Sequence, residues 1–258
     1  MLYCFLKTAA LPHQGGNTMP IETKRTYPSW LKGEFKSAQK VYTEETTLLS
    51  SDGTLLSPGW ARHMVFDYDR TLPKNPMRSK EWDFYQISNG KYMVQISVAN
   101  ISIGGYASAT ILDITDPEKS KKLGGGTIAN ATALFVGGKN KYVLPPKGDV
   151  PNNVKFTVKG IGKAELEFDT KETERTLYFK GRSKGKDIVC NFKMQIPEGL
   201  ENITTVLPFK GYPDRFFMTT KQNSMPCTGT FRIGDEVIFF SDEDTFACLD
   251  WGRVNTPY

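Results

Sequence analysis

The fold is decided by residues 81–98, which read EWDFYQISNGKYMVQISV. After the central Asn89-Gly90 pair, apolar side chains recur at every second position from Tyr92 to Val98. A period of two is typical of a β-strand that buries one face. Asn-Gly is a strong signal for a two-residue hairpin turn, because both residue types tolerate positive φ. The stretch therefore predicts an antiparallel hairpin formed by residues 81–88 and 91–103.

The same alternation returns later in the chain, with glycine-containing turns between the segments. Apolar side chains occupy alternate positions in residues 154–158, 164–168 and 188–196. Glycines at 160–162 and 181–185 supply the expected hairpin loops. Short strands at regular spacing, with no long amphipathic helix between them, are typical of an antiparallel barrel or sandwich. The sequence predicts an all-β fold.

The expected domain organisation has three parts. Residues 46–213 are predicted to form a first β-barrel module, and residues 214–258 the start of a second, truncated β module. The second module contains about three strands, which are too few to close a sheet of their own. We expect it either to join the first module or to leave exposed sheet edges through which the chain self-associates. Residues 1–45 are predicted to be an N-terminal extension, and Met19 offers a second start, in which case residues 1–18 are not native.

Composition narrows the classes of partner. The 33 Lys and Arg residues are interspersed with 28 Asp and Glu residues, so the sequence predicts no nucleic-acid partner. The four cysteines are too widely spaced for a zinc ribbon or a redox motif, which predicts free thiols and a reducing, cytoplasmic location. The sequence shows neither a transmembrane segment nor a phosphate-binding loop. We expect no metal and no cofactor.

Two motifs place acids beside tryptophan: EWDFY at residues 81–85 and LDWGR at residues 249–253. On a strand, Glu81, Asp83 and Tyr85 share one face, whereas Trp82 and Phe84 share the other. Two carboxylates on one face need basic partners, and the candidates are Arg62, Arg78, Lys221 and Arg253. A structural ion pair and a catalytic pair of acids both fit this pattern.

The second motif offers one such partner. In a regular strand Arg253 and Trp251 lie on the same face, so the guanidinium is expected to stack on the indole. Arginine also suits a bidentate contact with Glu81 or Asp83, which would tie the two modules together. Histidine is scarce: His63 is the single one beyond the first 45 residues, and no nucleophile motif accompanies it, which argues against hydrolase chemistry.

Four ordered motifs carry a resemblance to a known family. They are SPGWAR at 57–62, EWDFY at 81–85, KQNSMP at 221–226 and LDWGR at 249–253. With these motifs the chain resembles the domain of unknown function 2804 family over most of residues 48–253. That family is similar to lipocalin-like proteins that include carotenoid hydratases. The resemblance implies an antiparallel, lipocalin-like (calycin-type) barrel with a cavity for an apolar or amphipathic small molecule, and acid-catalysed hydration or isomerisation of an alkene as an associated activity.

Three functions fit these observations. In the first, the chain binds an apolar or amphipathic small molecule, with aromatic walls and polar groups that orient one end of the ligand. The polar patch at residues 221–223 suits that orienting role, although a surface loop explains it equally well. The predicted ligand-binding residues are Trp60, Arg62, Glu81, Trp82, Tyr85, Lys221, Gln222, Asn223, Trp251 and Arg253.

In the second function, the chain is a hydratase or isomerase of the lyase type that uses no metal or nucleotide cofactor. Asp83 or Asp250, kept protonated by burial, would donate a proton to an alkene while aromatic walls stabilise the developing cation. In the third, both tryptophan motifs are structural clasps, and the chain has no autonomous activity. The sequence does not choose between the three.

Overall fold

The computed structural model describes residues 40–120, 125–136, 144 and 152–257. Apart from a 3₁₀ turn at Pro76–Arg78 and a short helix α1 at Pro117–Ser120, the regular structure there is β-strand. The strands are β1 (Val41–Tyr42), β2 (Thr46–Thr47), β3 (Gly59–Ala61), β4 (Phe66–Asp67), β5 (Ser79–Ser88), β6 (Tyr92–Asn100), β7 (Gly104–Asp113), β8 (Thr127–Val136), β9 (Asn152–Gly160), β10 (Gly162–Thr170), β11 (Glu174–Ser183), β12 (Lys186–Gln195), β13 (Ile203–Phe209), β14 (Tyr212–Ile233), β15 (Glu236–Phe240) and β16 (Phe246–Asn255).

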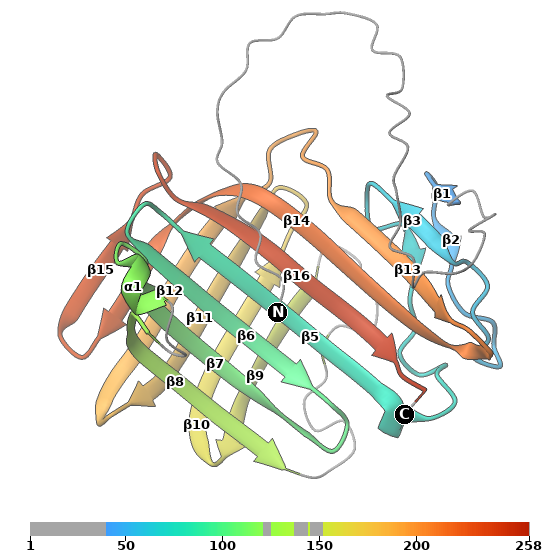
Figure 1. Ribbon diagram of the computed structural model, residues 1–258, viewed down its shortest axis with the longest axis horizontal. Coiled ribbons are helices and arrows are strands. Elements are labelled where there is room, and N and C mark those ends of the chain that lie inside the picture. The colour runs from blue at the N-terminus through green and yellow to red at the C-terminus, as the bar shows by residue number, and fades with distance from the viewer. Residues whose placement is uncertain (1–39, 121–124, 137–143, 145–151, 258) are drawn as a thin grey trace, which may run out of the picture. The chain divides into compact units, whose positions relative to one another are not determined.

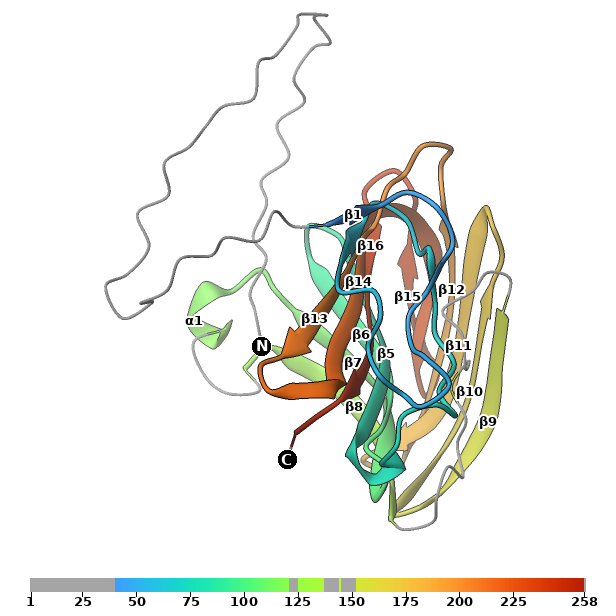
Figure 2. The ribbon, with the colours of Figure 1, turned by 90° about the vertical axis from the view of Figure 1, so that its right-hand side faces the viewer.

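One sheet follows the order β8-β7-β6-β5-β16-β14-β12-β11-β10-β9 (Figure 1). Neighbouring strands along this path are antiparallel. The sheet curls so that β5–β8 form one layer and β9–β12 the facing layer, which Figure 2 shows edge-on. The predicted all-β fold with an antiparallel, lipocalin-like barrel is confirmed. Within the described residues, no helix is both long enough and apolar enough to cross a membrane.

The two ends of the sheet meet at a narrow seam. Leu134 on β8 and Ile161 in the β9–β10 turn exchange two backbone hydrogen bonds of 2.8 and 3.1 Å. Gly160 makes this approach possible, because a Cβ at that position would lie 2.1 Å from the carbonyl oxygen of Leu134. Among the described residues, the sheet therefore closes on itself through this one hydrogen-bonded pair, with Gly160 beside it.

The hairpin predicted from residues 81–98 is present as β5 and β6, with Ser88 opposite Met93. Its turn differs from the expected type, because neither Asn89 nor Gly90 has positive φ. Instead the Asn89 side-chain oxygen accepts hydrogen bonds from the backbone N–H groups of Lys91 and Tyr92. The asparagine thus sets the turn through its side chain, as short polar residues do in Asx turns.

Strand β14 forms the corner between the layers. Before a bulge at residues 222–225 it pairs with β13 and β16. Beyond the bulge it pairs with β16 for two more residues and then, from Cys227, with β12 and β15. The bulge contains Ser224 in the left-handed region, with a φ of 61°. It also changes which residues face inward, from Phe216, Met218 and Thr220 before it to Met225 and Cys227 after it. Such a bulge lets one strand leave one layer and enter the other.

The predicted module boundary at residues 213 and 214 falls within the first residues of β14. Strands β14 and β16, which the sequence analysis assigned to a second module, lie between β5 and β12 in the common sheet. The division of the chain into a first barrel module and a second, truncated module stays a prediction. The predicted N-terminal extension, residues 1–45, lies outside the described residues as far as residue 39.

The space between the layers is filled by side chains of complementary size. The inner face of β7 and β8 carries buried alanines, whereas the facing strands β10–β12 contribute buried phenylalanines. Tyr85 on β5 reaches across to Phe168 on β10, with ring centroids 5.4 Å apart at a steep angle. Small residues on one layer thereby accommodate large ones on the other, which is how close packing is achieved. These buried alanines and phenylalanines are Ala107, Ala109, Ala131, Ala133, Phe168, Phe179 and Phe192.

Gly160→Ala is expected to lower the free energy of unfolding by about 1–3 kcal/mol, because the added methyl group collides with the Leu134 carbonyl and opens the seam. Gly90→Ala is the matched control, since a Cβ there meets nothing within 4 Å and the residue has no positive φ. Urea denaturation of both variants measures the difference. Equal stability of the two variants would show that the seam contributes nothing.

Candidate functional site

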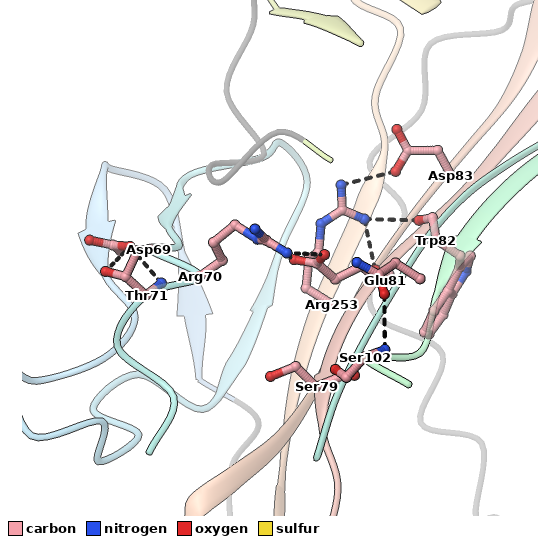
Figure 3. Close-up of polar contacts among 11 residues, drawn as sticks. Asp69, Arg70, Thr71, Ser79, Glu81, Trp82, Asp83, Ser102 and Arg253 are labelled. Carbon is pink, nitrogen blue, oxygen red and sulfur yellow. Dashed lines mark hydrogen bonds and ion pairs between the residues drawn. The ribbon is translucent and has the colours of Figure 1, made fainter. Parts of the chain in front are cut away.

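The interior of the barrel holds a buried ion pair between β16 and β5. The side chain of Arg253 is fully buried, and its Nη2 atom lies 2.9 Å from Asp83 Oδ1, without the alignment of a hydrogen bond. The Nη1 atom donates to the backbone carbonyls of Trp82 and Gly252 at 2.9 and 2.8 Å (Figure 3). The strand register sets this arrangement, because Arg253 lies opposite Glu81 and next to Gly252, which lies opposite Trp82.

Glycine is required at position 252 because a Cβ there would lie 2.0 Å from the indole ring of Trp82. The tryptophan thus lies against the outer face of β16 while Arg253 occupies the inner face. Arg253 also stacks on Trp251, with its guanidinium carbon 4.1 Å from the ring. The predicted stacking of these two residues is confirmed. This packing and the two carbonyl bonds fix the guanidinium in place beside Asp83.

Glu81 has a different partner from those that the sequence suggested. Arg70 binds it through two hydrogen bonds, from Nε to Oε1 at 2.9 Å and from Nη2 to Oε2 at 2.7 Å (Figure 3). Burial lowers the pKa of Arg70, but the hydrogen bonds and charge of Glu81 outweigh this effect and raise it overall. Burial, together with the charge of Glu81, also raises the pKa of nearby Tyr68. The bidentate pair expected for Arg253 is therefore made by Arg70.

The polar cluster continues past Asp83 to Tyr85 and Arg175. Arg175, which is only 8% exposed, donates from Nη1 to the Thr170 hydroxyl and from Nη2 to Gln222 Oε1, both at 3.1 Å. Burial raises the pKa of Tyr85, the positive charge of Arg175 lowers it, and the negative charge of Asp83 raises it, with a net upward shift. Within the part of the chain that the structure describes, no carboxylate lies within ion-pair distance of Arg175.

A cleft of about 860 Å³ opens above Arg175 and Gln222, where β12 gives way to β13. We call it the mouth cleft. Its polar lining comprises Glu45, His63, Asp67, Glu172, Thr173, Arg175, Glu198, Asn202 and Gln222. Its apolar lining comprises Met64, Val65, Ile196, Pro197 and Leu200. Arg175 and Gln222 are its buried floor, whereas Glu45, His63, Glu172 and Glu198 are exposed at its rim.

A second group of predicted residues lies on the outer face of the sheet. The Trp82 Nε1 atom donates to Asp250 Oδ1 at 3.0 Å, and Lys221 forms an ion pair with the same carboxylate. Asp250 and Lys221 each expose 39% of their side chains. Asp250 therefore lies on the opposite face of the sheet from Asp83, in a hydrated environment.

The predicted site residues thus divide into separate places. The interior brings together Glu81, Asp83, Tyr85, Gln222, Trp251 and Arg253, and the outer face brings together Trp82, Lys221 and Asp250. Arg62 is exposed and pairs with Glu201 at 2.6 Å, with its guanidinium 5.8 Å from the Trp60 ring. Asn223 is exposed at the bulge. Of all these residues, Gln222 is the one that also lines the mouth cleft.

Sequence reasoning missed Arg70 and Arg175. Arg70 lies between β4 and β5, where no strand periodicity assigns a face to it. Arg175 carried a usable signal, because it occupies the same strand phase as the buried residues Leu177 and Phe179. A charged residue in an apolar phase indicates a buried partner or a site. Within the described ranges, no group of three or more His, Cys, Asp or Glu residues is placed to hold a metal ion.

Comparison with known protein families gives a match over most of the chain. The family described as Domain of unknown function (DUF2804) matches residues 39–258. The four motifs from which the resemblance was drawn all lie within this range, and the resemblance is confirmed. No curated protein and no solved structure matches the chain.

Asp83→Asn is expected to lower the free energy of unfolding by about 3–5 kcal/mol, because it leaves the fully buried Arg253 without its counter-charge. Asp250→Asn is the matched control: it makes the same change beside the half-exposed Lys221 and is expected to cost about 0–1 kcal/mol. Urea denaturation at neutral pH compares them. Losses of similar size in the two variants would contradict the assignment of Asp83 as the buried counter-ion.

Proposed function

We propose that this chain, which belongs to the DUF2804 family, binds an amphipathic small molecule in the mouth cleft. The observation that carries the proposal is the combination in one cleft of an apolar wall and a buried polar floor. Met64, Val65 and Leu200 supply apolar surface, whereas Arg175 and Gln222 supply hydrogen-bonding groups at the floor. A molecule with one apolar part and one polar end fits both surfaces at once.

The size of the cleft supports this function. Its volume of about 860 Å³ is within the usual range for small-molecule sites, which is roughly 300–1,000 Å³. Sites of this kind use fixed polar groups to orient the ligand against an apolar surface. Here the orientation would come from Arg175, which its bonds to Thr170 and Gln222 hold in place.

An amphipathic small molecule is the class of ligand expected from the sequence, and the proposed place of binding is the mouth cleft. The inner residues Tyr85, Trp251 and Arg253 then act as support behind the cleft, since they are buried among other side chains. Tyr85 links the two regions, because the positive charge of Arg175 and the negative charge of Asp83 both act on the pKa of its hydroxyl group. Contact of the ligand with Trp60, Arg62 or Asn223 stays a prediction.

The alternative function, proton donation to an alkene by Asp83 or Asp250, draws less support from the geometry. Asp83 is the buried counter-ion of Arg253, a contact that gives it a structural role in place of that of a proton donor. Asp250 is half-exposed and forms an ion pair with Lys221 on the outer face of the sheet, away from the interior and outside the lining of the mouth cleft. The structural-clasp hypothesis draws support from the Arg253–Asp83 pair. Cytoplasmic location and self-association through sheet edges stay predictions.

The first test is native mass spectrometry of the gently purified chain. We expect the chain to carry a bound small molecule of low polarity. Leu200→Arg, which puts a charge on the apolar wall of the cleft, is expected to abolish this retention and to weaken the binding of dodecanol at least about tenfold. Leu207→Arg makes the same change at an exposed position outside the cleft lining and should have no effect.

If Leu207→Arg lowered binding as much as Leu200→Arg, the ligand would not occupy the mouth cleft. Thermal unfolding of both variants, measured alongside, separates a loss of binding from a loss of fold. A wild-type chain that retains no small molecule and binds no dodecanol would overturn the proposal.

A further inference from the structure

We infer that the ligand of the mouth cleft is an amphipathic monocarboxylate, and that Arg175 is the residue that recognises its carboxylate group. This inference rests on the proposed function and deepens it by naming the class of ligand. Its starting point is a difference between three arginines of the barrel. Arg70 and Arg253 each contact a buried carboxylate, Glu81 and Asp83 respectively. Arg175 is buried to a similar degree, but no carboxylate of the described residues lies within ion-pair distance of it.

The hydrogen-bond partners of Arg175 are polar but uncharged, and among the described residues no acid of the cleft lining, Asp67 and Glu172 included, lies within ion-pair distance of it. Its hydrogen-bond partners are the Thr170 hydroxyl and the Gln222 amide oxygen, and the Tyr85 hydroxyl lies beside it. Neutral acceptors satisfy individual N–H groups, yet they do not supply the negative charge that a desolvated guanidinium needs. An anionic group that enters the cleft would supply it. The charge balance of the floor therefore favours a ligand with a negative end.

The number of free donors favours a carboxylate in particular. A guanidinium has five N–H groups. In Arg175, Nη1 donates one hydrogen bond to Thr170 and Nη2 donates one to Gln222. The Nε atom donates to no described acceptor. The remaining N–H groups suit a carboxylate, because its two oxygens lie in one plane and pair with the edge of a guanidinium.

The rim of the cleft excludes ligands with more negative charge. Glu45, Glu172 and Glu198 line it as exposed acids, and no described base forms an ion pair with any of them. A phosphate monoester carries a charge of about −1.5 to −2 at neutral pH and would be repelled more strongly than a carboxylate. The apolar wall between rim and floor, at Val65, Ile196 and Leu200, suits an alkyl chain.

The experiment compares four probes of equal chain length by isothermal titration calorimetry: dodecanoate, dodecanol, dodecyl phosphate and dodecylammonium. Dodecanoate is expected to bind about tenfold or more tightly than the other three, which corresponds to one hydrogen-bonded charge at the floor. Tightest binding of dodecylammonium, or equal binding of dodecanoate and dodecanol, would overturn the inference.

A built-in carboxylate gives a second test that does not depend on removing the buried arginine. In the Gln222→Glu variant, one carboxylate oxygen replaces the amide oxygen that lies 3.1 Å from Arg175 Nη2. The variant is expected to unfold at a higher temperature than the wild type and to bind dodecanoate at least about tenfold more weakly, with dodecanol binding unchanged. Gln86→Glu adds the same charge away from the cleft lining and should change neither property.

The two proposals fail in distinguishable ways. If no probe binds the wild type, the proposed binding function is wrong. If dodecanol and dodecanoate bind with equal affinity and Gln222→Glu weakens neither, the cleft binds ligands but Arg175 does not recognise a carboxylate. A lower unfolding temperature of Gln222→Glu, with dodecanoate binding intact, would likewise overturn the role of Arg175.

Discussion

The compensation of arginine charge inside a closed β-sheet is the constraint on which the rest of the structure depends. A buried guanidinium is tolerated only when carboxylates or oriented carbonyls surround it. Arg253 has both, from Asp83 and from two backbone oxygens, and the register of β5 against β16 follows from that arrangement. A shift of that register by one residue would move the acids of β5 to the outer face and leave the arginine alone inside.

The bulge in β14 is the second determinant, because it decides where the barrel opens. By turning one strand from one layer into the other, it leaves β12 and β13 as separate neighbours along the same side of β14. The connection between them, residues 196–202, borders the mouth cleft, and Gln222 at the start of the bulge forms its floor. Fold and candidate site therefore share one irregularity, as is common for bulges beside functional sites.

Much of the fold was readable from the sequence, because strand alternation and glycine turns are local signals. The inward direction of Glu81, Asp83 and Tyr85 and the stack of Arg253 on Trp251 followed from period two alone. The pairing of residues far apart in the chain did not follow from it. Arg70 reaches Glu81 from a loop, and the cleft above Arg175 depends on how five separate segments meet. The bulge also reverses which residues of β14 face inward. The polar patch at residues 221–223, which a surface loop explained equally well, is part of this strand.

The pairing of β5 with β16 has a consequence for how the molecule forms. These strands are neighbours in the sheet, yet more than 150 residues separate them in the chain. During synthesis on the ribosome, one edge of β5 therefore stays unpaired until β16 has been made. Contacts of such long sequence separation slow folding, since the intervening chain must be ordered first. The newly made chain is thus expected to pass through a lengthy interval in which that open edge and the acids of β5 face water or a chaperone.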